Sequence, residues 1–348
     1  MAKKLEVRGL KISFQTDRGM LQAVRDISFA LEQGRTLAIV GESGSGKSVT
    51  SRAIMGILPS NAKVEDGEIL CDGKDLLQLS EDEMCAVRGS KVAMIFQDPM
   101  SSLNPVMRIG KQITETMLLR KEGKKPISSA RAKEKALELM KEVGIHQPER
   151  CFYQYPFQLS GGMRQRIVIA IALAGDPEIL ICDEPTTALD VTIQAQILDL
   201  IQRLKQERKL AVIFITHDLG VVARMADDIA VMYAGKIVEY GTAEDVFYDP
   251  RHPYTWALLS SVPDLDTAGA LEAIAGMPPD MVSPPEGDAF APRNPQALEI
   301  DFLQQPPAFQ VSATHWAATW LLHSDAPKME MPEILRHRLG KLAEGEQK

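Results

Sequence analysis

The chain has 348 residues, of which 45% are hydrophobic, 25% charged and 5% aromatic. This length allows one large domain with an appendage or two modest domains. The 39 basic and 47 acidic residues give a formal net charge of -8, which argues against a general binder of nucleic acid or anionic lipid because neither polyanion would release counterions on binding.

The sequence shows no sign of membrane insertion or of a disulfide framework. No apolar run reaches the ~18–20 residues that cross a bilayer, and the first residues lack the apolar stretch of a signal peptide. The cysteines are scattered and form no C-x-x-C pair; they are Cys71, Cys85, Cys151 and Cys182. We therefore expect a cytoplasmic protein without disulfides or thiolate-bound metal.

Strand and helix patterns alternate along the first part of the chain. Residues 5–34 alternate apolar and polar side chains, which predicts an antiparallel β entry. Residues 37–40 form an apolar strand that runs into a glycine-rich turn and a helix beginning near Lys47. Residues 91–96 are a second apolar strand, which ends at Gln97.

A helical insertion is predicted over about residues 98–165. The β pattern disappears there, and residues 129–143 carry apolar side chains at helical spacing before a capping Gly144. Apolar runs then return; they span residues 179–182, 210–215 and 229–233. This alternation predicts an α/β fold with a mostly parallel sheet flanked by helices.

The composition changes near residue 250. Prolines interrupt residues 251–348, which show little periodicity. We predict that residues 1–250 form the main domain and residues 251–348 a small, loop-rich C-terminal extension.

Residues 41–48, GESGSGKS, fit the P-loop pattern G-x-x-x-x-G-K-[ST]. Backbone N–H groups in such a turn cradle phosphates at the start of a helix. A chance glycine-rich turn is the alternative, but the preceding strand and following helix favour the P-loop. Lys47 is expected to reach the β and γ phosphates and Ser48 to bind Mg²⁺. The predicted nucleotide-binding positions here are Gly41, Ser43, Gly44, Ser45, Gly46, Lys47 and Ser48.

The strand at residues 179–182 ends in Asp183 and Glu184. A buried parallel strand delivers its last residues to the carboxyl edge of the sheet, where nucleotides bind. Asp183 is expected to hold Mg²⁺ through its water shell, and Glu184 to accept a proton from the attacking water. Such an ending also occurs in ordinary loop caps, so the interpretation depends on the P-loop as well.

Residues 159–166, LSGGMRQR, place Ser160, Gly161 and Gly162 at the start of another helix. This is a second anion-binding helix terminus in one chain. Because one chain rarely needs two γ-phosphate sites, we infer that this terminus closes over a nucleotide held by another subunit.

LSGGMRQR resembles the signature of ATP-binding-cassette (ABC) ATPases, and other motifs of that family follow in order. Gln97 in FQDP resembles the glutamine of the Q-loop, and His217 in ITHD the switch histidine. Phe14 stands where the family has an aromatic that stacks on adenine. Ala188, Leu189 and Asp190 match the loop that links two subunits, which places Asp190 near nucleotide.

The resemblance implies roles for these positions. Gln97 would contact Mg²⁺ and transmit the state of the nucleotide to the helical subdomain. The catalytic set implied by the family pattern is Glu184, His217, Gln97 and Lys47. The implied fold is a RecA-like P-loop NTPase core with an antiparallel β subdomain and an inserted helical subdomain.

Longer stretches resemble the ATPases of oligopeptide, dipeptide and nickel importers; they read MIFQDPMSSLNP, CDEPTTALDVTIQAQILDLI and RHPYTWALLSSVP. Many such relatives hold an iron–sulfur cluster with cysteines in the extension. The matching positions here are Asp288, Asn294, Asp301 and Thr319. We therefore expect no cluster, because cluster iron needs thiolate ligands. We expect apolar packing in its place by Phe290, Phe302, Phe309, Trp316 and Trp320.

The expected function is that of an ATP-hydrolysing, Mg²⁺-dependent subunit that powers oligopeptide import from the cytoplasmic face of the cell membrane. The family resemblance implies a second ATPase subunit, favoured to be a sister chain, two membrane permeases and, indirectly, an extracytoplasmic peptide-binding protein. No nucleic-acid partner is expected. Dipeptide or nickel cargo is the alternative within this class.

The sequence argues against ATPases of another class. DNA-repair relatives insert long coiled coils between P-loop and signature, whereas the stretch from Gly41 to Ser160 is short and lacks sustained heptads. Translation factors usually carry two cassettes in one chain. A P-loop kinase leaves the signature and His217 unexplained.

Overall fold

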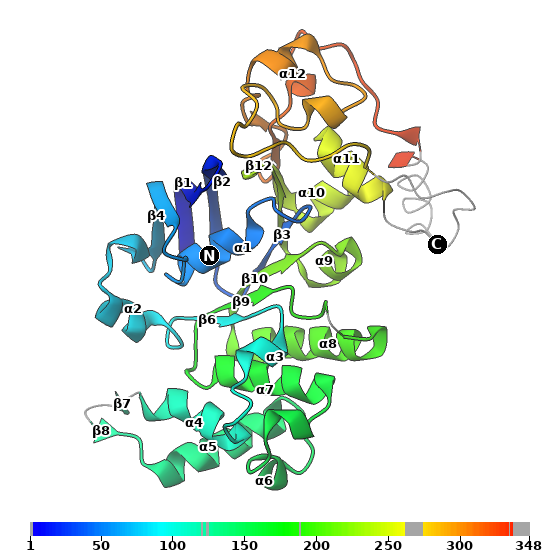
Figure 1. Ribbon diagram of the computed structural model, residues 1–348. Coiled ribbons are helices and arrows are strands. Elements are labelled where there is room, and N and C mark those ends of the chain that lie inside the picture. Colours follow the sequence, from blue (N-terminus) through cyan, green and yellow to red (C-terminus); the bar gives the residue numbers. More distant parts are fainter. Residues whose placement is uncertain are drawn as a thin grey trace, which may run out of the picture.

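The computed structural model describes residues 3–119, 121–122, 125–187, 189–261, 274–333 and 335–336. In this part of the chain no helix is both long enough and apolar enough to span a bilayer. A four-stranded sheet, an eight-stranded sheet and a helical region that includes a two-stranded sheet make up the described part of the chain (Figure 1).

An antiparallel sheet begins the chain, as predicted. It has the order β2-β1-β4-β5, and its strands are β1 (Lys3–Thr16), β2 (Gly19–Glu32), β4 (Ala62–Cys71) and β5 (Lys74–Asp75). Alternate side chains of β1 point into a core shared with the main sheet, among them Leu5, Val7 and Ile12. The alternation in residues 5–34 accounts for β1 and β2 but not for β4.

The main sheet contains the predicted apolar strands. Its parallel part has the order β11-β3-β10-β9-β6, and the strands are β3 (Thr36–Val40), β6 (Val92–Ile95), β9 (Ile179–Asp183), β10 (Ala211–Thr216) and β11 (Asp228–Tyr233). Both faces of these strands are buried, which explains why they are continuously apolar. A turn at Ala234 and Gly235 leads to the antiparallel β12 (Lys236–Thr242).

Helices cover both faces of this sheet (Figure 1). The helix after the P-loop, α1 (Lys47–Ile54), packs on the face that carries Ile181. The helix of the LSGG segment, α7 (Gly161–Leu173), packs on the opposite face with Leu180. Because neighbouring residues of a strand point to opposite faces, the P-loop helix and the LSGG helix are separated by the sheet.

The predicted helical insertion is present. It consists of α3 (Pro99–Ser102), α4 (Ile109–Leu118), β7 (Lys121–Glu122), β8 (Lys125–Pro126), α5 (Ser129–Glu142), α6 (Pro148–Cys151) and η2 (Pro156–Gln158). Val143 caps α5, and Gly144 follows with φ of 79°, as its capping role requires.

The remaining elements connect these layers or follow β12. They are η1 (Leu76–Gln78), α2 (Glu81–Val87), α8 (Val191–Arg208), α9 (Leu219–Met225), α10 (Ala243–Tyr248), α11 (Pro253–Ser260), η3 (Ala291–Arg293), α12 (Glu299–Leu303), β13 (Phe309–Gln310), β14 (Trp316–Ala317) and η4 (Trp320–Leu322). The extension is loop-rich, as predicted, but α11 was not expected in it. Strand β14 pairs with β12, so the extension joins the main sheet.

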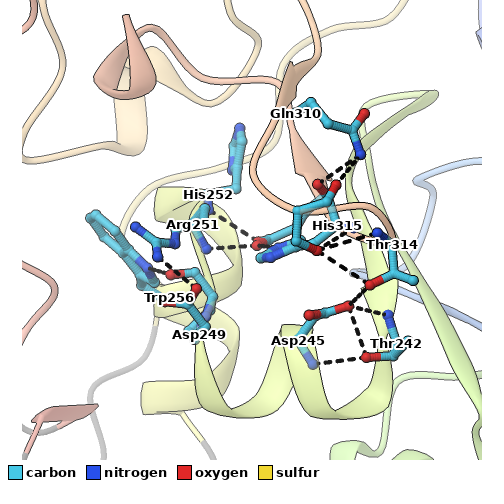
Figure 2. A network of polar contacts seen from close by, with 12 residues as sticks. Thr242, Asp245, Asp249, Arg251, His252, Trp256, Gln310, Thr314 and His315 are labelled. Atoms are coloured by element: carbon cyan, nitrogen blue, oxygen red, sulfur yellow. Dashed lines mark hydrogen bonds and ion pairs between the residues drawn. The ribbon is translucent and has the colours of Figure 1, made fainter. Parts of the chain in front are cut away.

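Polar contacts tie the extension to the main domain (Figure 2). The buried carboxylate of Glu239 on β12 lies 2.8 Å from His315 Nε2 and accepts the backbone N–H groups of Arg251 and His252 at 2.6 and 3.0 Å. Thr314 Oγ1 donates to Asp245 at 2.8 Å. These bonds satisfy a buried charge that would otherwise be costly.

The predicted aromatic packing in the extension is correct for part of the set. Phe290 is buried in the core beside β11, and the ring of Trp316 stacks on Tyr240 with centroids 6.2 Å apart. Phe309 and Trp320 contact each other edge to face. The prediction for Phe302 was wrong, because its side chain is 54% exposed. On the short α12 the inward position belongs to the neighbouring Asp301.

Candidate active site

The P-loop turn lies between β3 and α1, and close backbone approach requires two of its glycines. Gly41 has φ of 150°, and a Cβ atom there would lie 2.0 Å from the carbonyl oxygen of Met232. Gly46 has φ of 104°, and its Cβ would lie 2.5 Å from the carbonyl oxygen of Ala23. A side chain at either position would displace backbone, so only glycine keeps this turn. Ser43 and Gly44 at its tip are exposed.

Lys47 fills the inside of the turn. Its Nζ donates to the carbonyl oxygens of Gly41 and Glu42, both at 2.8 Å. Burial lowers the pKa of Lys47 because it penalises the ammonium form, against the opposing charges of Glu184 and Asp183. An ammonium in this position would gain from an anion such as a phosphate.

Asp183 and Ser48 meet at the carboxyl end of β9. The Ser48 hydroxyl donates to Asp183 Oδ1 at 2.9 Å. Burial raises the pKa of Asp183, and the bond from Ser48 offsets this only in part. A desolvated carboxylate beside a hydroxyl is an oxygen donor set of the kind that Mg²⁺ prefers, with waters completing the shell. These two residues therefore fit the predicted ion.

Glu184 is the centre of a second set of contacts. Gln97 Nε2 and Thr187 Oγ1 each donate to its Oε2 at 3.0 Å. His217 Nδ1 lies 3.3 Å from its Oε1. Glu184 itself has φ of 47°, an uncommon conformation for a non-glycine residue that turns the chain sharply after β9.

Several predicted residues thus come together from separate elements. Gln97 follows β6, Glu184 follows β9 and His217 follows β10, so three adjacent parallel strands deliver side chains to one edge. Thr187 was not predicted. The sequence feature that could have indicated it is its place three residues after Glu184 in a tight turn, where a threonine hydroxyl can reach back to the glutamate.

The signature residues lie at the start of α7, which packs on the opposite face of the sheet from α1. Ser160 caps α7, its hydroxyl accepting the N–H of Met163 at 3.3 Å. A Cβ atom on Gly161 would lie 3.9 Å from Leu189 Cδ2, so the start of α7 adjoins the loop before α8. Asp190 caps α8 by accepting the N–H of Ile193 at 3.0 Å.

Phe14 and Ala188 are the two remaining predicted positions. Phe14 lies on β1 and is half-buried against the core shared by the two sheets. Ala188, predicted in the subunit-linking loop, lies outside the described residues.

Comparison with known proteins identifies the family. Residues 24–187 match the ABC transporter family model, and residues 238–300 match the model of the oligopeptide/dipeptide transporter C-terminal region. The chain is 57% identical over 346 residues to the oligopeptide transport ATP-binding protein OppD of Bacillus subtilis, covering 99% of this chain and 96% of that protein. The chain belongs to the ABC transporter ATP-binding proteins. It is also 57% identical over 328 residues to the dipeptide transport ATP-binding protein DppD of Lactococcus lactis subsp. cremoris, covering 94% and 93% of the two chains.

Solved ABC cassettes share this fold. The dimeric cassette MJ0796 superposes with a TM-score of 0.61 at 27% identity, covering 98% of that chain but 69% of this one. A post-hydrolysis state of the same cassette, bound to ADP and Pi, matches with a TM-score of 0.61 at 26% identity. As an ABC ATPase, the chain binds and hydrolyses ATP.

Proposed function

We propose that this ATPase powers the import of oligopeptides across the cytoplasmic membrane and works at the cytoplasmic face of that membrane. The hydrolysis step of the proposal rests on the Glu184 carboxylate, held by Gln97, Thr187 and His217 at the edge of the sheet, and the transport role rests on the relatives and the matched transporter C-terminal region. A water positioned beside this carboxylate would lose its proton to it while attacking a phosphoryl group.

The remaining residues have complementary roles in the proposed mechanism. Lys47 and the N–H groups of the P-loop bind the β and γ phosphates of ATP, and Phe14 stacks on the adenine. Ser48, Asp183 and Gln97 would hold Mg²⁺, which would neutralise charge that develops on the phosphates. The attacking water forms a bond to the γ-phosphorus as the bond to the β–γ bridging oxygen breaks. ADP leaves with that electron pair, Glu184 takes the proton, and His217 stabilises the γ-phosphate.

A second ATPase subunit completes each site in this proposal. The signature residues are Ser160, Gly161 and Gly162, and they begin α7, which packs on the opposite face of the sheet from α1. Because the sheet keeps this signature away from the chain's own P-loop, we infer that a nucleotide on the P-loop meets the signature of another chain. Asp190 adjoins that surface. ATP favours the closed dimer and ADP the open one, and the permeases follow this population shift. The relatives' transport role supports a sister ATPase, two permeases and an indirect binding protein as partners.

The domain division and the cargo belong to the same proposal. We assign residues 1–250 to the nucleotide-binding domain and 251–348 to the extension; the two family models match residues 24–187 and 238–300, so the second match begins on β12, before residue 251. The relatives quoted above are named for oligopeptide and dipeptide transport, which favours a peptide over nickel. The match to a transporter C-terminal region likewise favours transport over DNA repair or translation.

Reconstitution tests the cargo. The chain is assembled with its sister ATPase, permeases and binding protein in vesicles, and ATP turnover is measured with the binding protein loaded in turn with an oligopeptide, a dipeptide or Ni²⁺. We expect the oligopeptide to stimulate turnover most. Equal or greater stimulation by a dipeptide or Ni²⁺ would show that oligopeptide is not the preferred cargo. No stimulation by any of them would contradict the importer proposal.

A further inference from the structure

Glu42, the second residue of the P-loop turn, is held through all of its polar groups. Its backbone N–H donates to Tyr254 Oη at 2.7 Å, and its carbonyl oxygen accepts Lys47 Nζ at 2.8 Å. Its carboxylate receives two bonds from the guanidinium of Arg293, at 2.7 and 2.9 Å. One of the two residues whose carbonyl oxygens bond to Lys47 is therefore itself fixed by the C-terminal extension.

Arg293 is firmly placed for this contact. It ends η3 in the extension, and its side chain is only 5% exposed. The guanidinium lies 5.8 and 5.9 Å from the ring centroids of Tyr233 and Phe290, and it also donates to Tyr233 Oη at 3.1 Å. Its Nε donates to the carbonyl oxygen of Ala275 at 2.9 Å. A planar guanidinium with this many partners presents its two outer nitrogens in one orientation.

The two residues that bond to Glu42, Tyr254 and Arg293, pack against the same aromatic rings. Tyr254, on α11, lies against Tyr233 with ring centroids 4.5 Å apart and against Phe290 at 5.3 Å. These rings are buried, so a shift of Arg293 would be opposed by close packing. The extension thus contributes a rigid support to the first turn of the P-loop.

We propose that Arg293 is a positioning residue for ATP binding: through its two bonds to Glu42 it holds the first turn of the P-loop, and with it Lys47, in the conformation that receives phosphate. This rests on the proposed roles of the P-loop residues. Ordering the turn before ATP arrives removes part of the entropy cost of binding. Loss of the pair would let the turn sample other conformations, and only the fraction that remains competent would bind.

A second ion pair provides a matched control. Arg18, in the turn between β1 and β2, pairs with Asp280 of the extension. Both side chains are well exposed, and the contacts described for Arg18 include none with the P-loop. Arg18→Ala therefore removes an arginine–carboxylate link between the main domain and the extension without changing any described contact of Glu42 or Arg293.

The test measures binding of a fluorescent ATP analogue with Mg²⁺ to the full-length chain. Arg293→Ala and Glu42→Gln should each weaken binding about tenfold, the scale expected for residues coupled by direct contact. The double variant should be no weaker than either single one, because both remove the same support. Arg293→Lys should recover part of the affinity, and Arg18→Ala should bind like the wild type. In the assembled transporter, KM for ATP should rise more than kcat falls.

The outcomes separate the two proposals. Wild-type affinity in Glu42→Gln, which leaves the extension untouched, would overturn the positioning role even if Arg293→Ala misfolds. Additive losses in the double variant would also overturn it, because Arg293 would then act by another route. Failure of the wild-type chain to bind the analogue would instead contradict the proposed function of the P-loop itself.

Discussion

At the scale of single residues, the proposal gives Lys47 and Glu184 separable tasks. Lys47 is buried inside the P-loop turn and bonds to its carbonyl oxygens, so it would contribute charge to the bound ground state. Glu184 stands beyond the turn among the side chains of Gln97, Thr187 and His217. Its position suits a group that acts on a water rather than on the nucleotide before reaction.

Substitution should separate binding from turnover. Lys47→Ala should weaken ATP binding roughly ten- to a hundredfold, because bonds from charged donors contribute about 1.5–3 kcal/mol. Glu184→Gln should bind ATP normally but lower turnover in the assembled transporter by about 10²–10⁴-fold, as loss of a general base does. Lys63→Ala, at an exposed lysine, is the control. A near wild-type turnover rate in Glu184→Gln would show that this carboxylate is not the base.

The signature glycines differ in how well they can be tested. A Cβ atom on Gly162 would lie 2.9 Å from Ile193 Cγ2 of the same chain, so substitution there strains this subunit whatever the partner does. Gly161 is exposed, and its Cβ would meet only Leu189 Cδ2 at 3.9 Å. Gly161 is therefore the better position for a test of action in trans.

Gly161→Glu should impair the partner's site and spare this chain's own. A carboxylate at the N-terminus of α7 suits the helix dipole but repels a phosphate that approaches from another subunit. We expect normal ATP binding by the isolated chain and about a hundredfold loss of coupled ATPase activity, the scale seen when a preorganised stabiliser of developing charge is lost. Gly161→Ala should have little effect. Weakened binding in the isolated Gly161→Glu chain would place the signature in its own pocket.

At the scale of elements, the extension uses polar side chains as turn caps. Asp288, Asn294 and Thr319 each accept the N–H two residues ahead, at 3.0, 3.0 and 3.3 Å. Asp301 accepts the N–H of Leu298 at 2.7 Å. All four side chains are buried, so their oxygens stabilise the loops from within.

These four positions should hold no iron. Each side chain uses one oxygen to accept a backbone N–H, and none supplies the thiolate that holds an iron–sulfur cluster. In the described part of the chain no group of three or more His, Cys, Asp and Glu side chains is arranged to bind a metal ion. Protein purified without oxygen should show neither charge-transfer absorption in the visible range nor stoichiometric iron. About four irons per chain would refute this prediction.

Asp288 should make the extension less stable at neutral pH. Burial raises its pKa to about 6, whereas the unfolded value is near 3.8. The folded state therefore binds the proton more tightly, and stability declines as pH rises through this window. His252 Nε2 lies 4.0 Å away, but burial lowers the pKa of His252 to about 4, so it is neutral over all but the acid end of this window.

Asp288→Asn keeps the acceptor for Phe290 and removes the charge. It should stabilise the chain by roughly 1–3 kcal/mol at pH 7.5 and by much less near pH 4. Denaturant unfolding at both pH values measures the difference. Asp280→Asn, at an exposed aspartate, is the control. An equal effect at both pH values would show that the charge of Asp288 is not what costs stability.

Local chemistry explains which features could be predicted. The P-loop and the acids after β9 depend on short segments, and parallel strands bring their carboxyl ends together, so the meeting of Gln97, Glu184 and His217 follows from the pattern. The contact between Arg293 and Glu42 joins residues far apart in sequence, and no periodic pattern in the sequence predicts it. Phe302 was misplaced because α12 is too short for its inward face to be read from the sequence.

At the scale of the whole molecule, the sheet separates the P-loop helix from the LSGG helix. The P-loop precedes α1 on one face, whereas the signature begins α7 on the other (Figure 1). Two chains placed head to tail would bring each P-loop against the other chain's signature. ATP would then be shared between subunits and would add its own contacts to the interface.

Assembly should therefore depend on nucleotide. Glu184→Gln keeps ATP unhydrolysed, so with ATP and Mg²⁺ the 38.4 kDa chain should form a dimer, with its sister ATPase in preference to a second copy. Light scattering after gel filtration measures the mass. Replacing ATP by ADP should return the chains to monomers, because the γ-phosphate contacts of both subunits are lost. Adding Gly161→Glu to both chains should prevent dimers even with ATP, since both signatures then repel the phosphate. A dimer that forms equally well without nucleotide, or that survives the Gly161→Glu change, would show that the interface does not run through the nucleotide sites.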